Sequence, residues 1–313
     1  MSKKVISIVS PCFNEEEGIK ECYETIKNIL SKLSNYNYEH IFCDNCSSDN
    51  TVKILKEIAE KDQNVKIIVN SRNFGLLNNT YNGVINCTGD AILLFMPIDM
   101  QDPPELIPQF IDLWEKGNEI VYGIRAKREE GFLLRNSRKL YYKILSRLTY
   151  VDYPVNVGDF QLIDRKVLNA MKETKDANPF MRLMTFDAGF NSIGIPYTWR
   201  ARKYGKSQNG LIKMFEQGLN GIISFSGVPL RLSLISGLII SLLSFVYAFT
   251  IFFMTLFGFV DSQSGIPTII VALFFFGGVQ LFFIGVLGEY ILAIFNQVRK
   301  KPLVVERERI NFK

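Results

Sequence analysis

Two oxygen-bearing side chains, Asp99 and Gln101, follow directly on the apolar run Ala91–Met96 and could hold a metal ion. A hard cation such as Mg²⁺, or Mn²⁺ in its place, binds one or two carboxylates together with phosphate oxygens. A strand end holds such ligands rigidly, so a metal here could bridge a diphosphate. An aspartate after a strand is equally often a turn or cap residue, and we expect Asp102, which precedes two prolines, to be a cap.

The elements that position these residues are indicated by short β-branched runs that alternate with amphipathic stretches in the first half of the chain. This pattern predicts an α/β fold with a mostly parallel central sheet covered by helices. The predicted strands are Val5–Ser10, Tyr38–Asp44, Val65–Asn70, Ala91–Met96 and Glu119–Gly123.

Polar residues gather just after four of the predicted strands, at Asn14–Glu17, Asp44–Asp49, Asn73–Asn79 and Asp99–Asp102. In open α/β sheets ligands bind beyond the carboxyl ends of the strands, so these loops should converge on one crevice suited to a nucleotide. No Gly-x-Gly-x-x-Gly follows the first strand, which argues against a dinucleotide cofactor.

The last third of the chain contains two long runs without charge, Leu232–Val260 and Ser262–Gly288. Each is longer than the roughly 20 apolar residues that cross a bilayer, whereas buried core helices rarely reach this length. We predict membrane helices over 232–260 and 266–298, joined by a short external loop at 261–265. Segment 209–231 is amphipathic, and lies either in the membrane interface or against the catalytic domain.

Positive charges set the expected orientation, because Lys and Arg are retained on the cytoplasmic side. Lys213 and Arg231 precede the first span and Arg299–Lys301 follow the second, whereas the connector carries no positive charge. Both ends, including a basic tail at 299–313, should therefore lie in the cytoplasm. The N-terminus has no signal-peptide pattern, so the hydrophilic part should not be exported.

Composition excludes some other functions. The net charge is +5, and the basic residues form no dense runs, so a membrane surface is a better partner than nucleic acid. Cys43 and Cys46 form a lone Cys-x-x-Cys, but zinc would need further ligands and His40 is the single histidine. Free thiols are expected for the five cysteines.

Several segments carry a more specific signal. Pro11–Glu16 is similar to a Pro-x-Tyr-Asn-Glu opening, and Arg202–Ser207 to an Arg-x-x-Gly-x-Ser-Lys phosphate loop. Together with the other segments, they resemble family-2 glycosyltransferases with a GT-A fold, in the branch that glycosylates polyprenyl phosphates. The other matching segments, in order, are Cys43–Thr51, Arg72–Gly75, Asp99–Glu105, Gly158–Leu162, Asn178–Arg182 and Gly278–Tyr290.

This resemblance implies a cytoplasmic GT-A catalytic domain over 1–208, anchored in the inner (plasma) membrane by two spans. It implies inverting transfer of one sugar from a nucleotide-sugar to a polyprenyl phosphate such as undecaprenyl phosphate, with glucose from UDP-glucose as the leading expectation. A divalent cation and a homo-oligomer are implied as well. Two other functions stay open: an impaired membrane scaffold that binds nucleotide-sugar, and a glycosyltransferase with a non-lipid acceptor.

The resemblance also assigns residues to roles. Catalysis is expected from Asp159, Asp99 and Arg202, and a metal would be held by Asp99 and Gln101. Independently of the resemblance, Arg125, Arg135 and Arg138 are candidates for the acceptor phosphate, because guanidinium groups suit phosphate geometry. The alternative is a solvated basic face near anionic lipid. The donor is expected at Pro11, Phe13, Glu15, Asp44, Asn45, Asp99, Gln101, Arg202 and Lys206.

The chain departs from the family pattern at three positions. Pro97 replaces the first aspartate of Asp-x-Asp, Asn45 replaces an aspartate at the base, and Gln208 replaces a lysine of the phosphate loop. An amide at position 45 can accept a hydrogen bond from uracil N3–H or donate one to cytosine N3, which weakens the expected uridine preference. Lys206 or Arg202 would compensate for the missing lysine.

Overall fold

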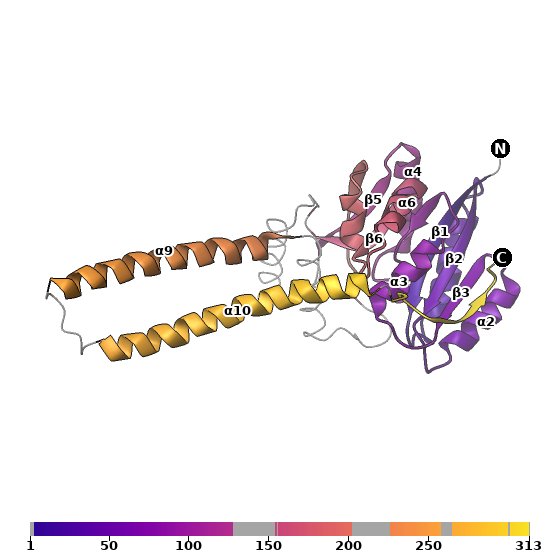
Figure 1. Cartoon of the computed structure of the whole chain (residues 1–313). Coiled ribbons are helices and arrows are strands. Elements are labelled where there is room, and N and C mark those ends of the chain that lie inside the picture. Colours follow the sequence, from indigo (N-terminus) through magenta and orange to yellow (C-terminus); the bar gives the residue numbers. More distant parts are fainter. Residues whose placement is uncertain are drawn as a thin grey trace. The chain divides into compact units, whose positions relative to one another are not determined.

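A computed structural model describes residues 3–127, 154, 156–201, 226–257, 265–299 and 301–312. These residues form two compact units. The sheet unit contains the described residues up to 201 together with 301–312, and the helical unit contains 226–257 and 265–299 (Figure 1).

The sheet unit is built on an eight-stranded sheet with the order β7-β5-β6-β4-β1-β2-β3-β8. Strands β1, β2, β3 and β4 pair in parallel, as do β5 and β7, whereas β6 and β8 run antiparallel to their neighbours. The strands are β1 (Lys4–Cys12), β2 (Tyr36–Asp44), β3 (Val65–Asn70), β4 (Ala91–Leu93), β5 (Ile120–Lys127), β6 (Val157–Asp164), β7 (Ser192–Thr198) and β8 (Glu306–Ile310).

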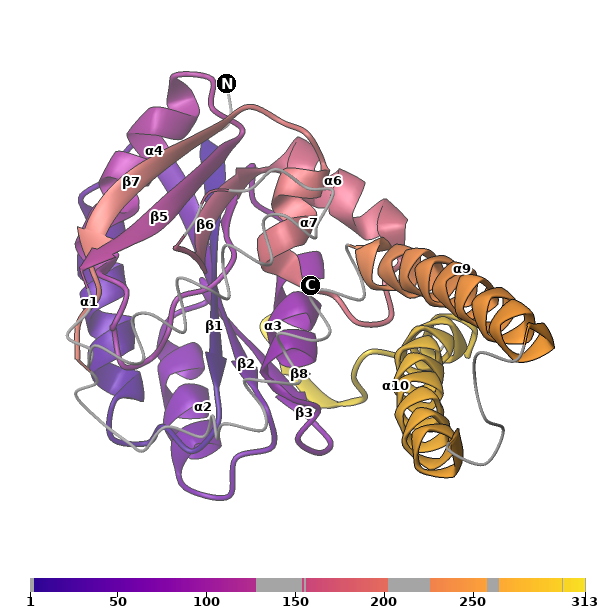
Figure 2. The ribbon, with the colours of Figure 1, turned by 90° about the vertical axis from the view of Figure 1, so that its left-hand side faces the viewer.

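Helices cover both faces of this sheet (Figure 2). One face carries α1 (Ile19–Ser31), α2 (Thr51–Lys61), the short 3₁₀ helix η1 (Pro104–Leu106) and α4 (Ile107–Glu115). The other carries α3 (Leu76–Ile85), α6 (Arg165–Thr174) and α7 (Met181–Asp187). The core between the layers includes the fully buried Phe42, Phe110 and Phe160, and each such side chain stabilises the fold by roughly 1.5–3 kcal/mol.

The predicted fold class, a mostly parallel α/β sheet followed by two long apolar helices, is confirmed. All five predicted strands are present, but β4 ends at Leu93 and not at Met96. Beyond Leu93 the backbone still bonds to both neighbours, through Leu94 N–H to Gln161 O (2.9 Å) and Met96 N–H to Val9 O (2.8 Å). These two N–H groups donate to opposite sides, so the strand is already irregular before Pro97, which has no N–H to donate.

The sequence did not predict β6, β7 or β8. Strand β8 lies in the segment expected to be a basic tail, and it pairs antiparallel with the edge strand β3. The end of the chain is therefore part of the sheet unit.

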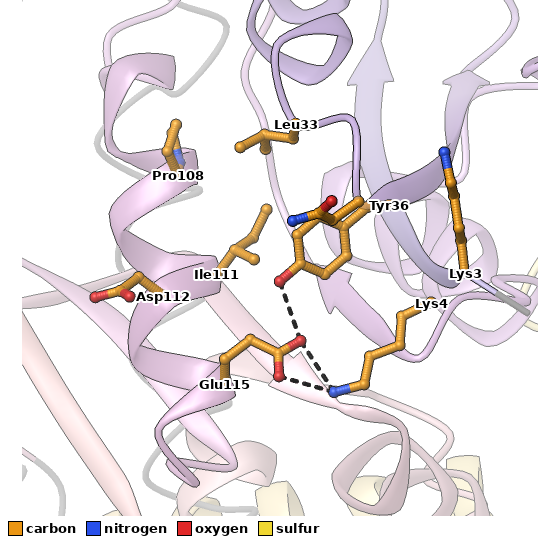
Figure 3. Close-up of a pocket in the computed structure, with 9 residues that line it drawn as sticks. Lys3, Lys4, Leu33, Tyr36, Pro108, Ile111, Asp112 and Glu115 are labelled. Atoms are coloured by element: carbon orange, nitrogen blue, oxygen red, sulfur yellow. Dashed lines mark hydrogen bonds and ion pairs between the residues drawn. The ribbon is translucent and has the colours of Figure 1, made fainter. Parts of the chain in front are cut away.

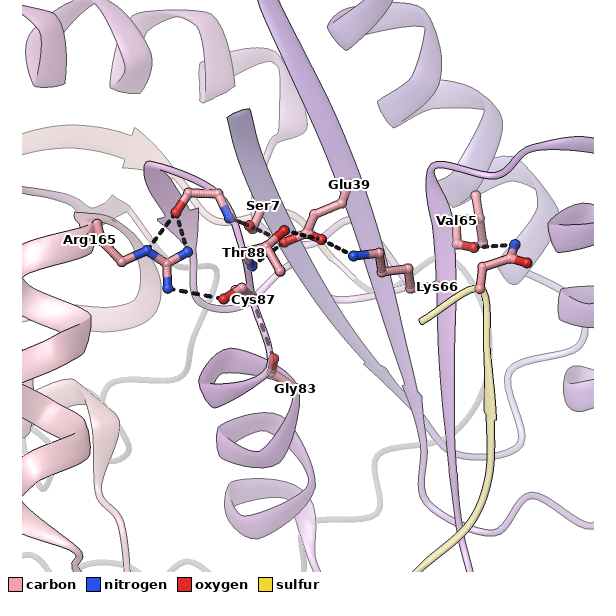
Figure 4. A network of polar contacts seen from close by, with 10 residues as sticks. Ser7, Glu39, Val65, Lys66, Gly83, Cys87, Thr88 and Arg165 are labelled. Atoms are coloured by element: carbon pink, nitrogen blue, oxygen red, sulfur yellow. Dashed lines mark hydrogen bonds and ion pairs between the residues drawn. The ribbon is translucent and has the colours of Figure 1, made fainter. Parts of the chain in front are cut away.

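A buried ion pair joins the amino-terminal halves of the parallel strands (Figure 4). Glu39 is 4% exposed and accepts hydrogen bonds from Ser7 Oγ, from Thr88 N–H (2.6 Å) and Oγ1 (2.9 Å), and from Lys66 Nζ. The pKa of Glu39 lies below its usual value, because these hydrogen bonds together outweigh the effect of burial. This group links β1, β2, β3 and the turn before β4.

The helical unit consists of α9 (Val228–Leu256) and α10 (Ile266–Val298), which contact each other. Both helices are long and apolar enough to cross a membrane, by length and composition. Large side chains such as Leu238 and Phe274 are exposed, 63% and 74% respectively. Near the end of α10, Tyr290 donates from its hydroxyl to Ser226 O (2.7 Å).

Stability of the sheet unit should depend on pH through His40. Its ring is fully buried, it contacts Ser10 Oγ through Nε2 (2.8 Å), and burial lowers its pKa to about 3. The unfolded chain, with a pKa near 6.5, binds the proton more readily, so the free energy of unfolding should fall by about 1.4 kcal/mol per pH unit below about pH 6.5. Thermal unfolding of the full chain between pH 7.5 and 5, compared with His40→Gln, measures this. Parallel pH profiles for the two proteins would contradict it.

Candidate functional site

The loops that follow β1 and β2 are joined by hydrogen bonds into one rim at the carboxyl edge of the sheet. Asn14 N–H donates to Ser47 Oγ (2.9 Å), and Ser48 N–H donates back to Asn14 Oδ1 (2.8 Å). Glu15 N–H donates to Thr51 Oγ1 (2.9 Å). These hydrogen bonds therefore hold the two loops together. They carry most of the predicted base and ribose contacts, namely Pro11, Phe13, Glu15, Asp44 and Asn45.

Asp44 organises the second of these loops. Its side chain is fully buried and accepts hydrogen bonds from Ser47 N–H (2.9 Å) and from Ser47 Oγ. Burial raises the pKa of the Asp44 carboxyl, and the bonds from Ser47 act in the opposite direction.

Asn45 connects this rim to the loop after β3. Its Oδ1 accepts from Phe74 N–H (2.9 Å) and from Asn70 Nδ2 (3.2 Å). Its Nδ2 donates to Asn73 Oδ1 (2.9 Å), which also accepts from Gly75 N–H (2.9 Å).

Backbone groups fix the direction of every amide in this network. Phe74 N–H and Gly75 N–H can only donate, so Asn45 must present oxygen to the first and nitrogen to Asn73. With two donors on Oδ1, the Asn45 carbonyl is saturated and one Nδ2 hydrogen remains for a ligand. Of the two base contacts considered for Asn45, donation fits this network and acceptance from uracil N3–H does not. A uracil would have to accept from Asn45 through a carbonyl oxygen.

Asp99 and Gln101 lie in the loop after β4, beside the end of β7. Asp99 is 5% exposed, and its Oδ1 accepts from Gln101 N–H (3.3 Å). Arg200 N–H donates to Gln101 O (3.0 Å), and Gln101 Nε2 donates to Arg200 O (3.3 Å). The predicted metal loop is thus bonded to the chain two residues before Arg202.

The donor set at this loop fits a hard divalent cation that draws most of its ligands from a substrate. Asp99 supplies carboxylate oxygen and Gln101 supplies amide oxygen, both of which suit Mg²⁺ or Mn²⁺. In the described part of the chain, no group of three or more His, Cys, Asp or Glu side chains could hold a metal ion. A metal here would therefore depend on phosphate oxygens.

Asp159, on β6, forms an ion pair with Arg182 on α7. Arg182 Nη2 donates to Asp159 Oδ2 (2.8 Å), and the two side chains are 21% and 18% exposed. Asp159 Oδ1 is buried, and no described residue donates a hydrogen bond to it. Arg182 is held in turn by Thr185, whose hydroxyl bonds to Gln161 Oε1 (2.7 Å) and to Arg182 O (3.2 Å).

The register between β4 and β6 brings these two parts together. Leu93 pairs with Leu162 and Leu94 N–H bonds to Gln161 O, so Asp159 lies level with the chain just before Asp99.

Arg125, expected at the acceptor phosphate, contacts a buried carboxylate. Its Nη2 lies 3.3 Å from both oxygens of Asp102, and its Nε donates to Tyr197 Oη (3.0 Å). Burial lowers the pKa of Arg125, but Asp102 and Tyr197 outweigh this and the pKa lies above its usual value. A Cβ at Gly158 would lie 2.9 Å from this guanidinium, so Arg125 packs directly against Gly158, the neighbour of Asp159 in β6. The phosphate role of Arg125 stays a prediction.

Other expected site residues lie outside the described residues, namely Arg135, Arg138, Arg202, Lys206 and Gln208. Segment 209–225 lies there too. Sequence reasoning missed the roles of Tyr197, Arg182 and the cluster Asn70, Asn73 and Asn79. Two signals were available: the density of asparagines between positions 70 and 82, and the place of Arg182 at the end of the matching segment Asn178–Arg182.

A hollow lies at the opposite edge of the sheet (Figure 3). It is lined by Lys4 and Tyr36, the first residues of β1 and β2, and by Glu115 of α4. Glu115 accepts from Lys4 Nζ (2.9 Å) and Tyr36 Oη (3.1 Å). Since ligands of such sheets bind at the carboxyl edge, we do not place the chemistry here.

Comparison with known proteins identifies the class. The model of glycosyl transferase family 2 matches residues 7–171, and the chain belongs to this family. It is a glycosyltransferase, and the expected GT-A class agrees with the mixed, mostly parallel sheet.

Similar proteins cover nearly the full chain. The uncharacterized glycosyltransferase YkcC of Bacillus subtilis is 38% identical over 96% of this chain and 92% of the relative. The bactoprenol glucosyl transferase of Shigella phage SfX is 35% identical over 97% of this chain and 99% of the relative. Among solved structures, glucosyl-3-phosphoglycerate synthase from Mycobacterium tuberculosis in complex with Mn²⁺, UDP-glucose and phosphoglyceric acid has a TM-score of 0.45 and 18% identity, covering 70% and 78% of the two chains.

The amide network predicts that Asn45→Asp damages this site, although it restores the family's usual residue. A carboxylate at position 45 would set a second acceptor against Asn73 Oδ1, whose direction Gly75 fixes. We expect the free energy of unfolding to fall by about 1–3 kcal/mol, with a lower melting temperature and weaker nucleotide binding. Asn28→Asp, which makes the same charge change at an exposed position of α1, is the control for thermal unfolding. Equal melting temperatures of the Asn45→Asp and Asn28→Asp proteins would contradict the network's role.

Proposed function

We propose that this chain is a membrane-bound inverting glycosyltransferase that transfers one sugar, with glucose from UDP-glucose as the first candidate, to a polyprenyl phosphate such as undecaprenyl phosphate. The observation that carries the proposal is the Asp159–Arg182 ion pair, which lies at the edge of the sheet from which the Asp99 loop also leaves. The full-length similarity to a bactoprenol glucosyl transferase supports the same acceptor.

The available bases favour an acceptor that arrives already ionised. A sugar hydroxyl needs a general base. With the single histidine of this chain buried against Ser10, that role would fall to a carboxylate such as Asp159, which is already paired with Arg182. A lipid monophosphate has a second pKa near 6, so its oxygen is nucleophilic at neutral pH without a base. Phosphate chemistry therefore matches what the sheet unit offers.

In this proposal Arg182 attracts the acceptor phosphate, and Asp159 orients it through the ion pair. The phosphate oxygen attacks the anomeric carbon, the bond to the nucleoside diphosphate breaks, and the configuration inverts in a single displacement. Mg²⁺ or Mn²⁺, held by Asp99 and Gln101, would stabilise the charge of the departing diphosphate. Arg202 and Lys206 would face the same phosphates, and Arg125, Arg135 and Arg138 would add positive charge on the acceptor side.

The sheet itself supports the proposed topology. Strand β8 follows α10 in the chain and pairs with β3, which precedes α9. A chain that crosses a membrane through α9 and α10 must therefore return to the side it left. Arg231 and Arg299–Lys301 flank the two helices, which favours the cytoplasm for that side and the inner membrane for the spans. A homo-oligomer remains part of this proposal.

The direct test is a transfer assay on purified full-length protein with Mg²⁺, undecaprenyl phosphate and a panel of UDP-, GDP- and CDP-sugars. Mass spectrometry should find one lipid-linked sugar. We expect Asp99→Ala to lower kcat/KM by about 100-fold or more, because a metal ligand acts mainly on the departing charge. Asp112→Asn, an exposed carboxylate paired with Lys116, is the control and should match the wild type.

Two results would count against the proposal. If nucleotide-sugar binds but no donor gives any lipid product, the impaired scaffold gains support. If transfer proceeds to a soluble acceptor without lipid, the helices are an anchor only.

A further inference from the structure

The segment after α10 is fixed to the sheet unit by more than strand pairing. Ser71 N–H donates to Val305 O (2.8 Å), just before β8, which lies beside β3 (Figure 2). Asn82 Nδ2 on α3 donates to Glu306 (2.6 Å), and Asn311 Nδ2 donates to Ala59 O (2.9 Å). This segment therefore has a defined position beside the loop after β3.

Arg307 is the residue of β8 that reaches the rim of the candidate donor site. Its Nη2 donates to Ser71 O (3.2 Å) and lies 4.0 Å from Cys46 Sγ. Cys46 is the neighbour of Asn45, and Ser71 leads into the loop that Asn45 holds. The guanidinium thus borders the place where the rim and the β3 loop meet.

Most of the hydrogen-bonding capacity of Arg307 is not used by the residues that the structure describes. A guanidinium has five N–H donors, and among the described residues only Ser71 O and the Cys46 sulfur accept from this one. The side chain is exposed. Arg309 on the same strand differs, because its Nε and Nη2 both donate to Glu306 and its guanidinium stacks on Phe312.

We propose that Arg307 is a donor-binding residue, supplied by the chain after the second long helix, which donates hydrogen bonds to oxygen atoms of the donor's nucleoside diphosphate. This rests on the proposed use of a nucleotide-sugar. Asn45 offers one N–H at the same place, so this side of the site presents donors and recognises acceptor atoms of the ligand. The strand that closes the sheet edge thereby also completes the donor site.

The test measures binding, not turnover, with detergent-solubilised full-length protein and isothermal titration of UDP, CDP and GDP. Arg307→Ala should raise the Kd of the best-bound nucleotide about tenfold, because it removes a charge-assisted hydrogen bond. Arg307→Lys keeps the positive charge but loses the planar set of guanidinium donors, and it should raise the same Kd about threefold. Arg309→Ala removes an arginine from the same strand and should bind like the wild type.

Steady-state kinetics then separate a contact from a structural effect. Arg307→Ala should raise KM for the nucleotide-sugar and leave KM for the polyprenyl phosphate unchanged. A nucleotide Kd within twofold of wild type in Arg307→Ala would overturn the proposal. An equal rise in KM for both substrates together with a lower melting temperature would also overturn it, because that would indicate a structural effect. If the wild type itself binds none of the three nucleotides, the proposed function fails first, and this inference falls with it.

Discussion

The register between β4 and β6 determines which side chains meet at the carboxyl edge of the sheet. Strand β4 pairs parallel with β1 on one side and antiparallel with β6 on the other. A shift of one residue in the second pairing would turn Asp159 to the other face of the sheet and separate it from Arg182. The buried residues of β6, among them Phe160 and Leu162, resist such a shift because they would leave the core.

Around that pairing, the edge is made rigid by polar groups that bond to one another. Asn14 and Ser47 join two loops, Asn45 joins them to a third, and Gln101 joins the fourth to the end of β7. Loops held in this way are preorganised, so little ordering remains when a charged ligand binds. The same arrangement explains how an asparagine can replace a carboxylate at position 45, since the network needs both an acceptor and a donor there.

Much of the fold was predictable, because each of the first five strands has its own apolar run and four of them are followed by a polar loop. Strands β6 and β7 were not, since they depend on antiparallel and distant partners that local periodicity does not reveal. Strand β8 carries four charged residues in five positions, so its sequence does not indicate a strand, and only the pairing with β3 shows that it is one. Asp159 was found through family resemblance, whereas its partner Arg182 and the asparagine network required the tertiary structure.

The central claim is that an ionised lipid phosphate, and not a hydroxyl, attacks the sugar. The most direct test compares undecaprenyl phosphate with undecaprenol as acceptors for the same protein and donor, with lipid products identified by mass spectrometry. We predict a lipid-linked sugar from the monophosphate and none from the alcohol. Transfer to undecaprenol at a comparable rate would contradict the account, because it would show that an alcohol serves as well as an ionised phosphate, with a carboxylate such as Asp159 as its base.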